Sequence, residues 1–581
     1  MASQRNRSCT DGCPAFSALL RLWKRCQVSY YGGKYSVERL FAFEAYIKSN
    51  SLPRVLLICI GTPIPMIALV ILQEVLPLQD PTFGWCENYT FWIRAAILAF
   101  VVAQSIAGQA RYIIDGVTIS EWHLAIVSAC ASIIFTICAM IVSANLIFPV
   151  PFFVLTLAPM FYVILIISFR IIVGGRIWCE MLTHSDQLIR YIVFVCAQVT
   201  VAFVYPIYES LFHFVEGTRY QFAVILLLPV IKVGVKNMML RCTKHMEDMI
   251  PEAVIFTVDF FNAIYVATCM QSASSVIAVT AISVTDLVQA SVMLYGLHRR
   301  TATIRPKLNH ILHSSMDDGN IVIMAGLLCR DFEKFKKQSH VDIHLRSCIP
   351  HVVDSEDKEI LNTFESKVNG TQSLTKPPSG SVHGSSKHHK PRALWAGTEA
   401  NVIHPILPTT NNITNGPSQI VPTAKSTALR ETLEMFFTSE CIIVTGYLEA
   451  VVPLFYCGYI LMMVHLPSAL YHTEMTGITR DNVGGTVLPL FIFALLQVAS
   501  FILLALVIKR NCGMRALYQL AFVLETQMSL IQGKMMLWMV ITICFRVVHF
   551  GKWRRYRINL VVVIPYEFAL FTCRYGLHFS V

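Results

Sequence analysis

Five polar side chains lie where the sequence is otherwise almost entirely apolar. They are Asp259 and Asn262 in the run PEAVIFTVDFFNAIYVATCMQ that begins at Pro251, and Asp286, Glu449 and Lys232 in three further runs. An aspartate at the centre of a membrane-spanning helix costs about 2.5–3.5 kcal/mol on insertion scales. A carboxylate kept at that cost can bind a cation, exchange a proton, or pair with a buried lysine.

Helical spacing sorts these residues into two polar stripes. With about 3.6 residues per turn, Asp259 shares a helix face with Asn262 and Cys269. The second stripe, at three-residue intervals on the next run, consists of Ser283, Asp286 and Gln289. Two adjacent helices could place the stripes against each other or along a common cavity.

Prolines predict irregular helices near one of the carboxylates and in the first run. Glu449 in GYLEAVVPLFY lies four residues before Pro453, which should loosen the helix and free a carbonyl group. A broken helix beside a carboxylate is one way in which membrane proteins bind cations. The sequence GTPIP at Gly61 predicts a similar kink, whose simplest interpretation is a structural bend.

Lys232 leaves two interpretations of the carboxylates open. It could neutralise either aspartate as a buried counter-ion, which would indicate a structural role. It could instead extend toward the membrane surface, as Lys236 and Arg241 just beyond it suggest. Without a cation beside them, the carboxylates would become proton-exchanging groups.

Composition indicates the class of protein. Of the 581 residues, 55% are hydrophobic and 14% are charged, whereas soluble proteins contain about 25% charged residues. A transmembrane barrel would show alternation in segments of about ten residues rather than long apolar runs. The net charge of +11 comes mostly from Lys and Arg between the runs, where orientation signals belong, so it does not indicate nucleic-acid binding.

Apolar runs of about 18–25 residues predict an all-α, polytopic helical membrane protein with about eleven spans, within a range of ten to twelve. The expected spans are 53–76, 91–110, 122–147, 152–173, 190–211, 220–241, 253–270, 275–297, 440–464, 485–508 and 533–550. No cleavable signal peptide is expected before the first run, which is too long and too far from Met1.

Flanking charges predict the orientation. Basic residues are frequent before the first span and absent from the following loop LPLQDPTFGWCENYT, so we expect a cytoplasmic N-terminus. Asn88 begins a glycosylation sequon in that loop, on the expected external side. The plasma membrane is favoured by default and by this sequon.

The chain divides by composition into five parts. They are a basic segment (1–51), an eight-span block (52–298), a cytoplasmic loop (299–430, disordered after about 366), a three-span block (431–551) and an atypical tail (552–581). The Ser-, Thr-, Pro- and Asn-rich part of the loop is typical of disorder. The simplest interpretation of the loop is a tether, and a phosphorylated regulatory segment is the alternative.

Several segments carry a resemblance: YSVERL at Tyr35, PLQDPTFGW at Pro77, NYTFWIR at Asn88, VDFFNAIYVATCMQ at Val258 and VVHFG at Val547. Together they resemble a large family of multi-pass membrane proteins of oomycetes, with no established activity. The resemblance implies membrane class and span arrangement and no site residues. Members of that family end soon after the His-aromatic-Gly motif, whereas here KWRRYRINLVVVIPYEFALFTCR follows. We interpret this stretch as translated intron; a twelfth short segment at 558–573 is the alternative.

The leading functional hypothesis is a cation- or proton-linked transporter with the aspartates at its midplane and a small ion or solute as substrate. The alternative is a membrane sensor or scaffold that acts through its long loop. Phosphate-loop, zinc-protease, nucleophile-elbow and kinase motifs are lacking, so we expect no enzyme activity, no cofactor and no metal, and the lipid bilayer as the main partner. A transporter needs a continuous polar cavity reaching Asp259 or Asp286, whereas a scaffold can seal them against Lys232 or amides.

Overall fold

The structure is a computed structural model, which describes residues 33, 35–114, 119–215, 217–218, 220–243, 247–273, 276–312, 320–330, 343–349, 351–373 and 424–550. These residues fold into helices and contain no strand. Ten helical stretches are long and apolar enough to cross a membrane, and a bent pair makes eleven. The predicted polytopic helical membrane protein is confirmed.

The spans lie close to the predicted runs. They are α3 and α4 (Leu52–Gly61 and Ile64–Val75, one span), α5 (Tyr89–Ile113), α6 (Glu121–Asn145), α10 (Ser185–Phe214), α11 (Gln221–Thr243), α12 (Phe256–Ser272) after the π-helical turn η4 (Pro251–Ile255), α13 (Val276–Leu312), α16 (Ala424–Met463), α17 (Val483–Cys512) and α19 (Met528–Arg546). Several extend beyond the apolar run that predicted them, α16 by more than a dozen residues at its start.

Shorter helices complete the fold. They are α2 (Val37–Ser49), α7 (Phe153–Thr156), α8 (Ala158–Val173), α9 (Gly175–Thr183), α14 (Ile321–Arg330), α15 (Ser355–Ser373) and α18 (Ala516–Thr526), with one-turn helices η2 (Pro81–Phe83), η3 (Glu247–Met249), η6 (Pro467–Tyr471), η7 (Thr473–Met475) and η8 (Val548–Phe550). The sequence did not predict α18, which is half the length of a span and packs against α3.

Two of the predicted helix irregularities can be compared with the structure. The first span is interrupted at Thr62 and Pro63, where a kink was predicted. At Pro453 the helix α16 continues without a break, and the proline leaves the Glu449 carbonyl without its usual N–H donor, which is the freed carbonyl expected there.

The predicted span 152–173 differs from the others in being followed by a sharp bend. It consists of α7 and α8, and α8 is followed by a bend of 115° into α9. Gly174 lies at this bend with φ +91°, a conformation that glycine adopts without steric cost.

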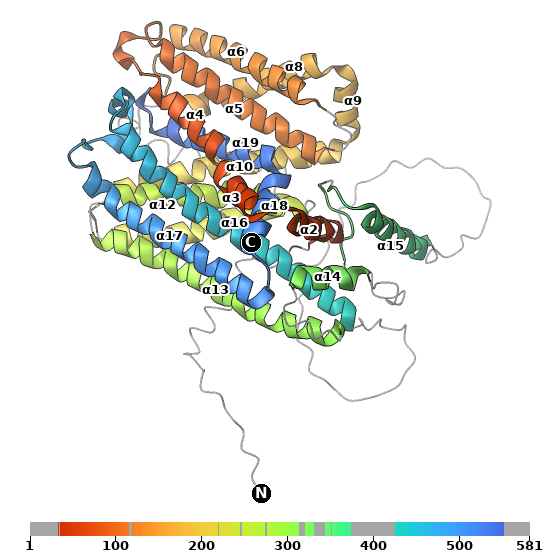
Figure 1. The fold of residues 1–581 in the computed structure, drawn as a ribbon. Coiled ribbons are helices and arrows are strands. Elements are labelled where there is room, and N and C mark those ends of the chain that lie inside the picture. Colours follow the sequence, from red (N-terminus) through yellow and green to blue (C-terminus); the bar gives the residue numbers. More distant parts are fainter. Residues whose placement is uncertain are drawn as a thin grey trace, which may run out of the picture.

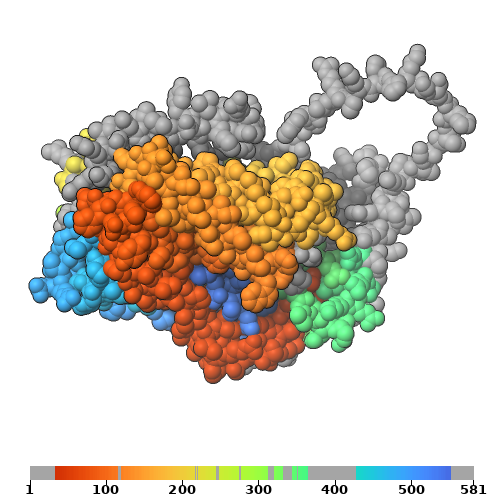
Figure 2. Space-filling view, turned by 90° about the horizontal axis from the view of Figure 1, so that it is seen from above, coloured from red at the N-terminus to blue at the C-terminus, as the bar shows by residue number. Residues whose placement is uncertain are grey.

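The helices form one bundle (Figure 1). One layer contains α5, α6 and α8, another contains α12, α13, α16 and α17, and α10 and α19 contact both. Figure 2 shows the face covered by the segments from α4 to α9. Because α16 packs on α12 and α19 packs on α5, helices that follow the long loop are interleaved with helices that precede it.

Part of the predicted loop is folded against the bundle. Backbone N–H groups of Val37 and Glu38 in α2 donate to the carbonyls of His344 and Leu345 at 3.0 and 3.1 Å. Arg330 in α14 pairs with Asp357 of α15 at 2.9 Å and with the buried Glu44 of α2 at 3.0 Å. Of the part expected to be disordered, after about 366, residues up to 373 belong instead to α15 and residues 424–430 to α16. The remainder, from 374 to 423, and the tail after 550 lie outside the described residues.

Gly326 of α14 allows this docking and gives a test of it. A Cβ atom there would lie 2.2 Å from a carboxylate oxygen of Glu44, so Gly326→Ala should displace Glu44 from Arg330. We expect the docking of α14 and α15 to weaken by about 1–3 kcal/mol, measured as faster limited proteolysis of this segment. The matched control is Gly458→Ala on α16, where a Cβ meets nothing within 4 Å; equal proteolysis of both variants would contradict the assignment.

Candidate functional site

A cluster of charged side chains lies inside the bundle where α11, α12, α13 and α16 meet. The helix α12 is buried along nearly its whole length, so Asp259 faces protein rather than lipid. Lys232 and Lys236, one turn apart on α11, both point to it. The Lys236 ammonium group lies 2.7 and 3.1 Å from the two Asp259 oxygens, and the Lys232 ammonium group lies 3.4 Å from one of them.

Lys232 also contacts a second carboxylate. Its ammonium group donates to Glu449 of α16 at 2.8 Å, so it bridges Asp259 and Glu449. The hydroxyl of Thr445, one turn before Glu449, donates to Asp259 at 2.8 Å. All of these side chains are buried, so their charges are compensated by one another rather than by water.

Asp286 of α13 is the third carboxylate and has a different partner. The amide group of Gln497 on α17 donates a hydrogen bond to it, and Asp286 makes no ion pair with any other described residue. Gln497 in turn lines a cavity of about 20 Å³ together with Glu449. Gln497 therefore contacts Asp286 and borders the cavity that Glu449 also lines.

A second cavity of about 20 Å³ lies on the other side of Asp286. Its polar lining residues are Asn262, Thr285, Asp286 and Gln289. The two predicted stripes thus share a cavity, although Asp259 itself faces the lysines. Each cavity has room for about one water molecule, and a continuous polar passage through the described helices is not seen.

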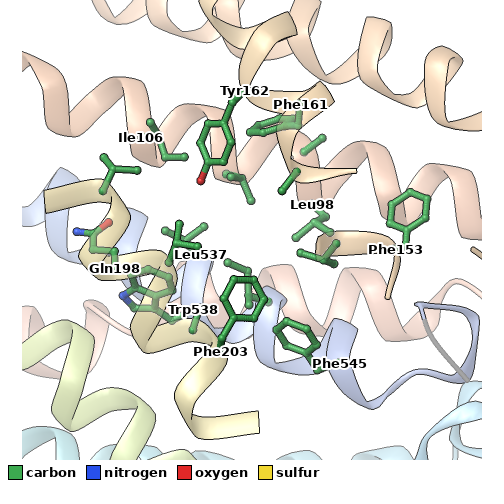
Figure 3. A pocket seen from close by; sticks show the side chains of 18 of the residues that line it. Leu98, Ile106, Phe153, Phe161, Tyr162, Gln198, Phe203, Leu537, Trp538 and Phe545 are labelled. Carbon is green, nitrogen blue, oxygen red and sulfur yellow. The ribbon is translucent and has the colours of Figure 1, made fainter. Parts of the chain in front are cut away.

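The larger pockets are apolar and separate from this cluster. One of about 100 Å³ lies between α5, α8, α10 and α19 (Figure 3). Phe161, Phe203, Trp538 and Phe545 surround it, and Tyr162 and Gln198 lie at its edge. Another, of about 410 Å³, lies between α4, α5, α6 and α19 and is also apolar. Neither lining offers a charged group to an ion, so the chemistry of the bundle lies in the carboxylate cluster.

Another buried charge network lies where η6 and η7 meet the ends of α4 and α5; we call it the His472 end. His472 is within 3.0 Å of Glu74 and 3.4 Å of Glu474. Arg94 pairs with Glu74 at 3.1 Å and donates to Ser468 at 2.9 Å. These contacts join the loop between α16 and α17 to α4 and α5.

The His472 end predicts a pH dependence of stability. Burial alone would lower the pKa of His472, but the Glu74 carboxylate and hydrogen bonds to Glu474 and Glu74 outweigh it and raise the pKa from 6.5 to about 9. Because the folded pKa is the higher one, this stabilisation is complete below about pH 6.5 and is lost as the pH rises through about 9, a change of about 3 kcal/mol. Thermal unfolding over that range should show the loss in the native protein and not in His472→Gln; equal pH profiles would contradict it.

The structure brings most of the sequence-derived candidates together. Lys232 lies between Asp259 and Glu449, Asn262 lines the cavity beside Asp286, and Lys236 is buried on Asp259 rather than extended toward the surface. Asn88 is fully buried, and its amide donates to the carbonyls of Asp80 and Gly84 at 3.1 and 2.8 Å. Glycosylation at Asn88 would therefore require this loop to open.

Sequence reasoning missed several participants. They are Lys236, Thr445 and Gln497, whose contacts with the carboxylates cannot be assigned from sequence spacing. One signal was available: Lys232 and Lys236 lie four residues apart in an apolar run, which places them on one helix face where they can share a partner. Within the described residues, no group of three or more His, Cys, Asp or Glu side chains could hold a metal ion.

The chain has no significant match among family models, curated proteins or solved structures. The resemblance to the oomycete membrane proteins therefore stays a prediction, and function has to be argued from the cluster itself.

Proposed function

We propose that this multi-pass membrane protein is a proton-linked transporter, in which the cluster around Asp259 binds and releases one proton per cycle. The observation that supports the proposal is the charge count in the cluster. Among the described residues, the cations that pair with Asp259 and Glu449 are Lys232 and Lys236, and Asp286 pairs with none. Three carboxylates and two ammonium groups in this cluster leave one negative charge when all are ionised. A buried excess charge is costly, and one proton removes it.

Asp286 is the proposed proton carrier. Its partner among the described residues is the neutral Gln497, and a cavity the size of a water molecule adjoins it. Protonated Asp286 keeps one oxygen to accept from the Gln497 amide, so both protonation states have a hydrogen-bond partner.

Lys232 is the proposed mobile element. It lies 2.8 Å from Glu449 and 3.4 Å from Asp259, so a change of charge on either side would move its ammonium group. Pro229 lies one turn before Lys232 inside α11, and Pro453 lies one turn after Glu449 inside α16. Prolines remove backbone hydrogen bonds and favour bending, so both helices can bend next to the cluster.

The test is proton movement in proteoliposomes that carry a trapped pH-sensitive dye. A panel of ions and small solutes is added under an imposed pH gradient, and we expect at least one to drive dye-reported proton flux. Asp286→Asn should abolish that flux while the protein remains folded. Flux that is unchanged in Asp286→Asn, or absent across the panel for the native protein, would overturn the proposal.

For orientation, we propose a cytoplasmic location of the end that carries α2 and α14, and the plasma membrane as the site of action. The basic segment before α3 supports this orientation. Cys86, an exposed thiol in the loop between α4 and α5, should then react with an impermeant maleimide added to intact cells. Labelling that is identical in Cys86→Ser, or that requires permeabilised cells, would contradict it.

A second candidate function is a sensor, and the docked α14–α15 segment favours it. Arg330 ties this segment to Glu44 of α2, and α2 packs on α18 of the bundle. In a sensor, protonation of the buried cluster should change the hydrogen-exchange protection of α14 and α15. Arg330→Met should abolish this change in protection. If the protection of α14 and α15 stays the same over the pH range in which proton flux occurs, the sensor role is excluded.

A further inference from the structure

Glu252 is a buried carboxyl group that the cluster around Asp259 does not use. It lies in the π-helical turn η4, at the start of the buried helix, and it is fully buried. Neither of its carboxyl oxygens has a hydrogen-bond partner among the residues that the structure describes. π-helical turns within helices are frequent at functional sites, and a buried carboxylate without donors is among the most costly groups a protein can hold.

Lys534 is one of two cations near Glu252, and its hydrogen bond goes to the backbone rather than to the carboxyl group. Lys534 of α19 is buried, and its ammonium group donates to the backbone carbonyl of Glu252 at 3.2 Å. The same ammonium group lies 5.5 Å from the centre of the Phe194 ring, where a cation is attracted to the aromatic face. Lys534 is therefore held beside Glu252 but not in an ion pair with it.

Arg39 is the second cation in this region, and its guanidinium group already binds other partners. Its guanidinium group pairs with Glu440 of α16 at 2.7 Å and donates to the Asp248 backbone carbonyl at 2.6 Å. It also lies over the rings of Tyr35 and Phe522, at 5.3 and 5.9 Å from their centres. We call this region the Arg39 end.

The charged groups of this region include one negative charge in excess. The titratable groups that face Glu252 are Arg39, Lys534, Glu440, Cys348 and Cys441, and Asp248 faces Arg39 and Glu440. His351, beside Arg39, adds no charge, because burial and Arg39 lower its pKa to about 4. With the acids and bases ionised, Glu252, Glu440 and Asp248 outnumber Arg39 and Lys534 by one.

We propose that Glu252 is a second proton-binding site and carries a proton in the folded protein at neutral pH. A neutral carboxylic acid fits a position without donors far better than a carboxylate does. Glu252 precedes Asp259 by seven residues, about 10 Å along a helix axis, so the two proton sites lie on one helix. The inference does not depend on transport at Asp286, because a bound proton on Glu252 would exist in a protein that transports nothing.

The experiment is infrared titration of the purified full-length protein. A protonated carboxylic acid has a C=O stretching band that is well separated from the carboxylate bands and shifts in D2O. The native protein at neutral pH should show such a band, and Glu252→Gln should lose part of it. In an Asp286→Asn background, which removes the other proposed proton site, Glu252→Gln should lose the band entirely. Glu356→Gln, at an exposed position on α15, is the matched control and should keep the band.

A second variant keeps the inference testable if Glu252→Gln does not fold. In Lys534→Met, loss of the neighbouring positive charge should move the disappearance of the band to higher pH. An identical band in the native protein and folded Glu252→Gln would overturn the proposal. A band that is absent from the native protein and appears only in Lys534→Met would also overturn it, since Glu252 would then be ionised and held by Lys534.

Discussion

Replacing Lys232 by methionine is expected to destabilise the protein by about 3–5 kcal/mol. The variant keeps the length of the side chain but leaves Glu449 buried without a cation and Asp259 with Lys236 alone. Chemical or thermal unfolding in detergent measures the change. The loss should be largely recovered in Lys232→Met combined with Glu449→Gln, because removing both partners of a buried pair is far less costly than removing one.

Lys307→Met is the matched control for this effect. Lys307 pairs with Glu431 at 2.7 Å, close to the distance between Lys232 and Glu449, but its side chain is 53% exposed. An exposed ion pair contributes about 0–1 kcal/mol, so this variant should remain close to the native protein. Equal effects of the two lysine substitutions would show that the central pair is not buried as described.

Arg39→Met is expected to have a comparably large effect at the other end of the bundle. Glu440 would lose its pair at 2.7 Å, and the Asp248 carbonyl would lose a donor. Because both partners of the pair are almost fully buried, we expect a loss of about 3–5 kcal/mol, measured by the same unfolding assay.

Arg54→Met provides the control with the same residue type. Arg54 pairs with Glu525 at the same distance of 2.7 Å, but its side chain is 58% exposed. Arg54→Met should therefore leave the free energy of unfolding close to that of the native protein. A loss at Arg39 no greater than at Arg54 would contradict the claim that α2 is fixed to the bundle by a buried ion pair.

The sequence predicted the helices well because the bilayer imposes a length and an apolar composition on each span. It predicted Asp259, Asp286 and Glu449 as candidates for the same reason, since a carboxylate stands out inside an apolar run. It could not assign their partners. Whether Lys232 meets Asp259, Glu449 or the membrane surface depends on which helices are neighbours, and local spacing does not specify helix neighbours.

Glu252 and Glu440 were missed for a different physical reason. The expected spans began at 253 and 440, so both glutamates looked like the polar flanks that usually mark the ends of a span. In the structure α12 and α16 are buried by other helices at these positions, so a charge that looked like a boundary lies inside protein. An apolar run in the sequence marks the part of a helix that can lie in the membrane. The start of α12 and the middle of α16 continue beyond that part as buried helix, where they contact α2, α19 and each other.

The most direct test of the central claim is the current that a rapid change of pH evokes in proteoliposomes on a solid support. The native protein, supplied with the solute identified by flux, should give a transient current. Asp286→Asn should remove that current, and Asp481→Asn, at an exposed loop position, should leave it unchanged. A current of equal size in folded Asp286→Asn would contradict the account, because the excess charge of the buried cluster would then have no part in moving protons.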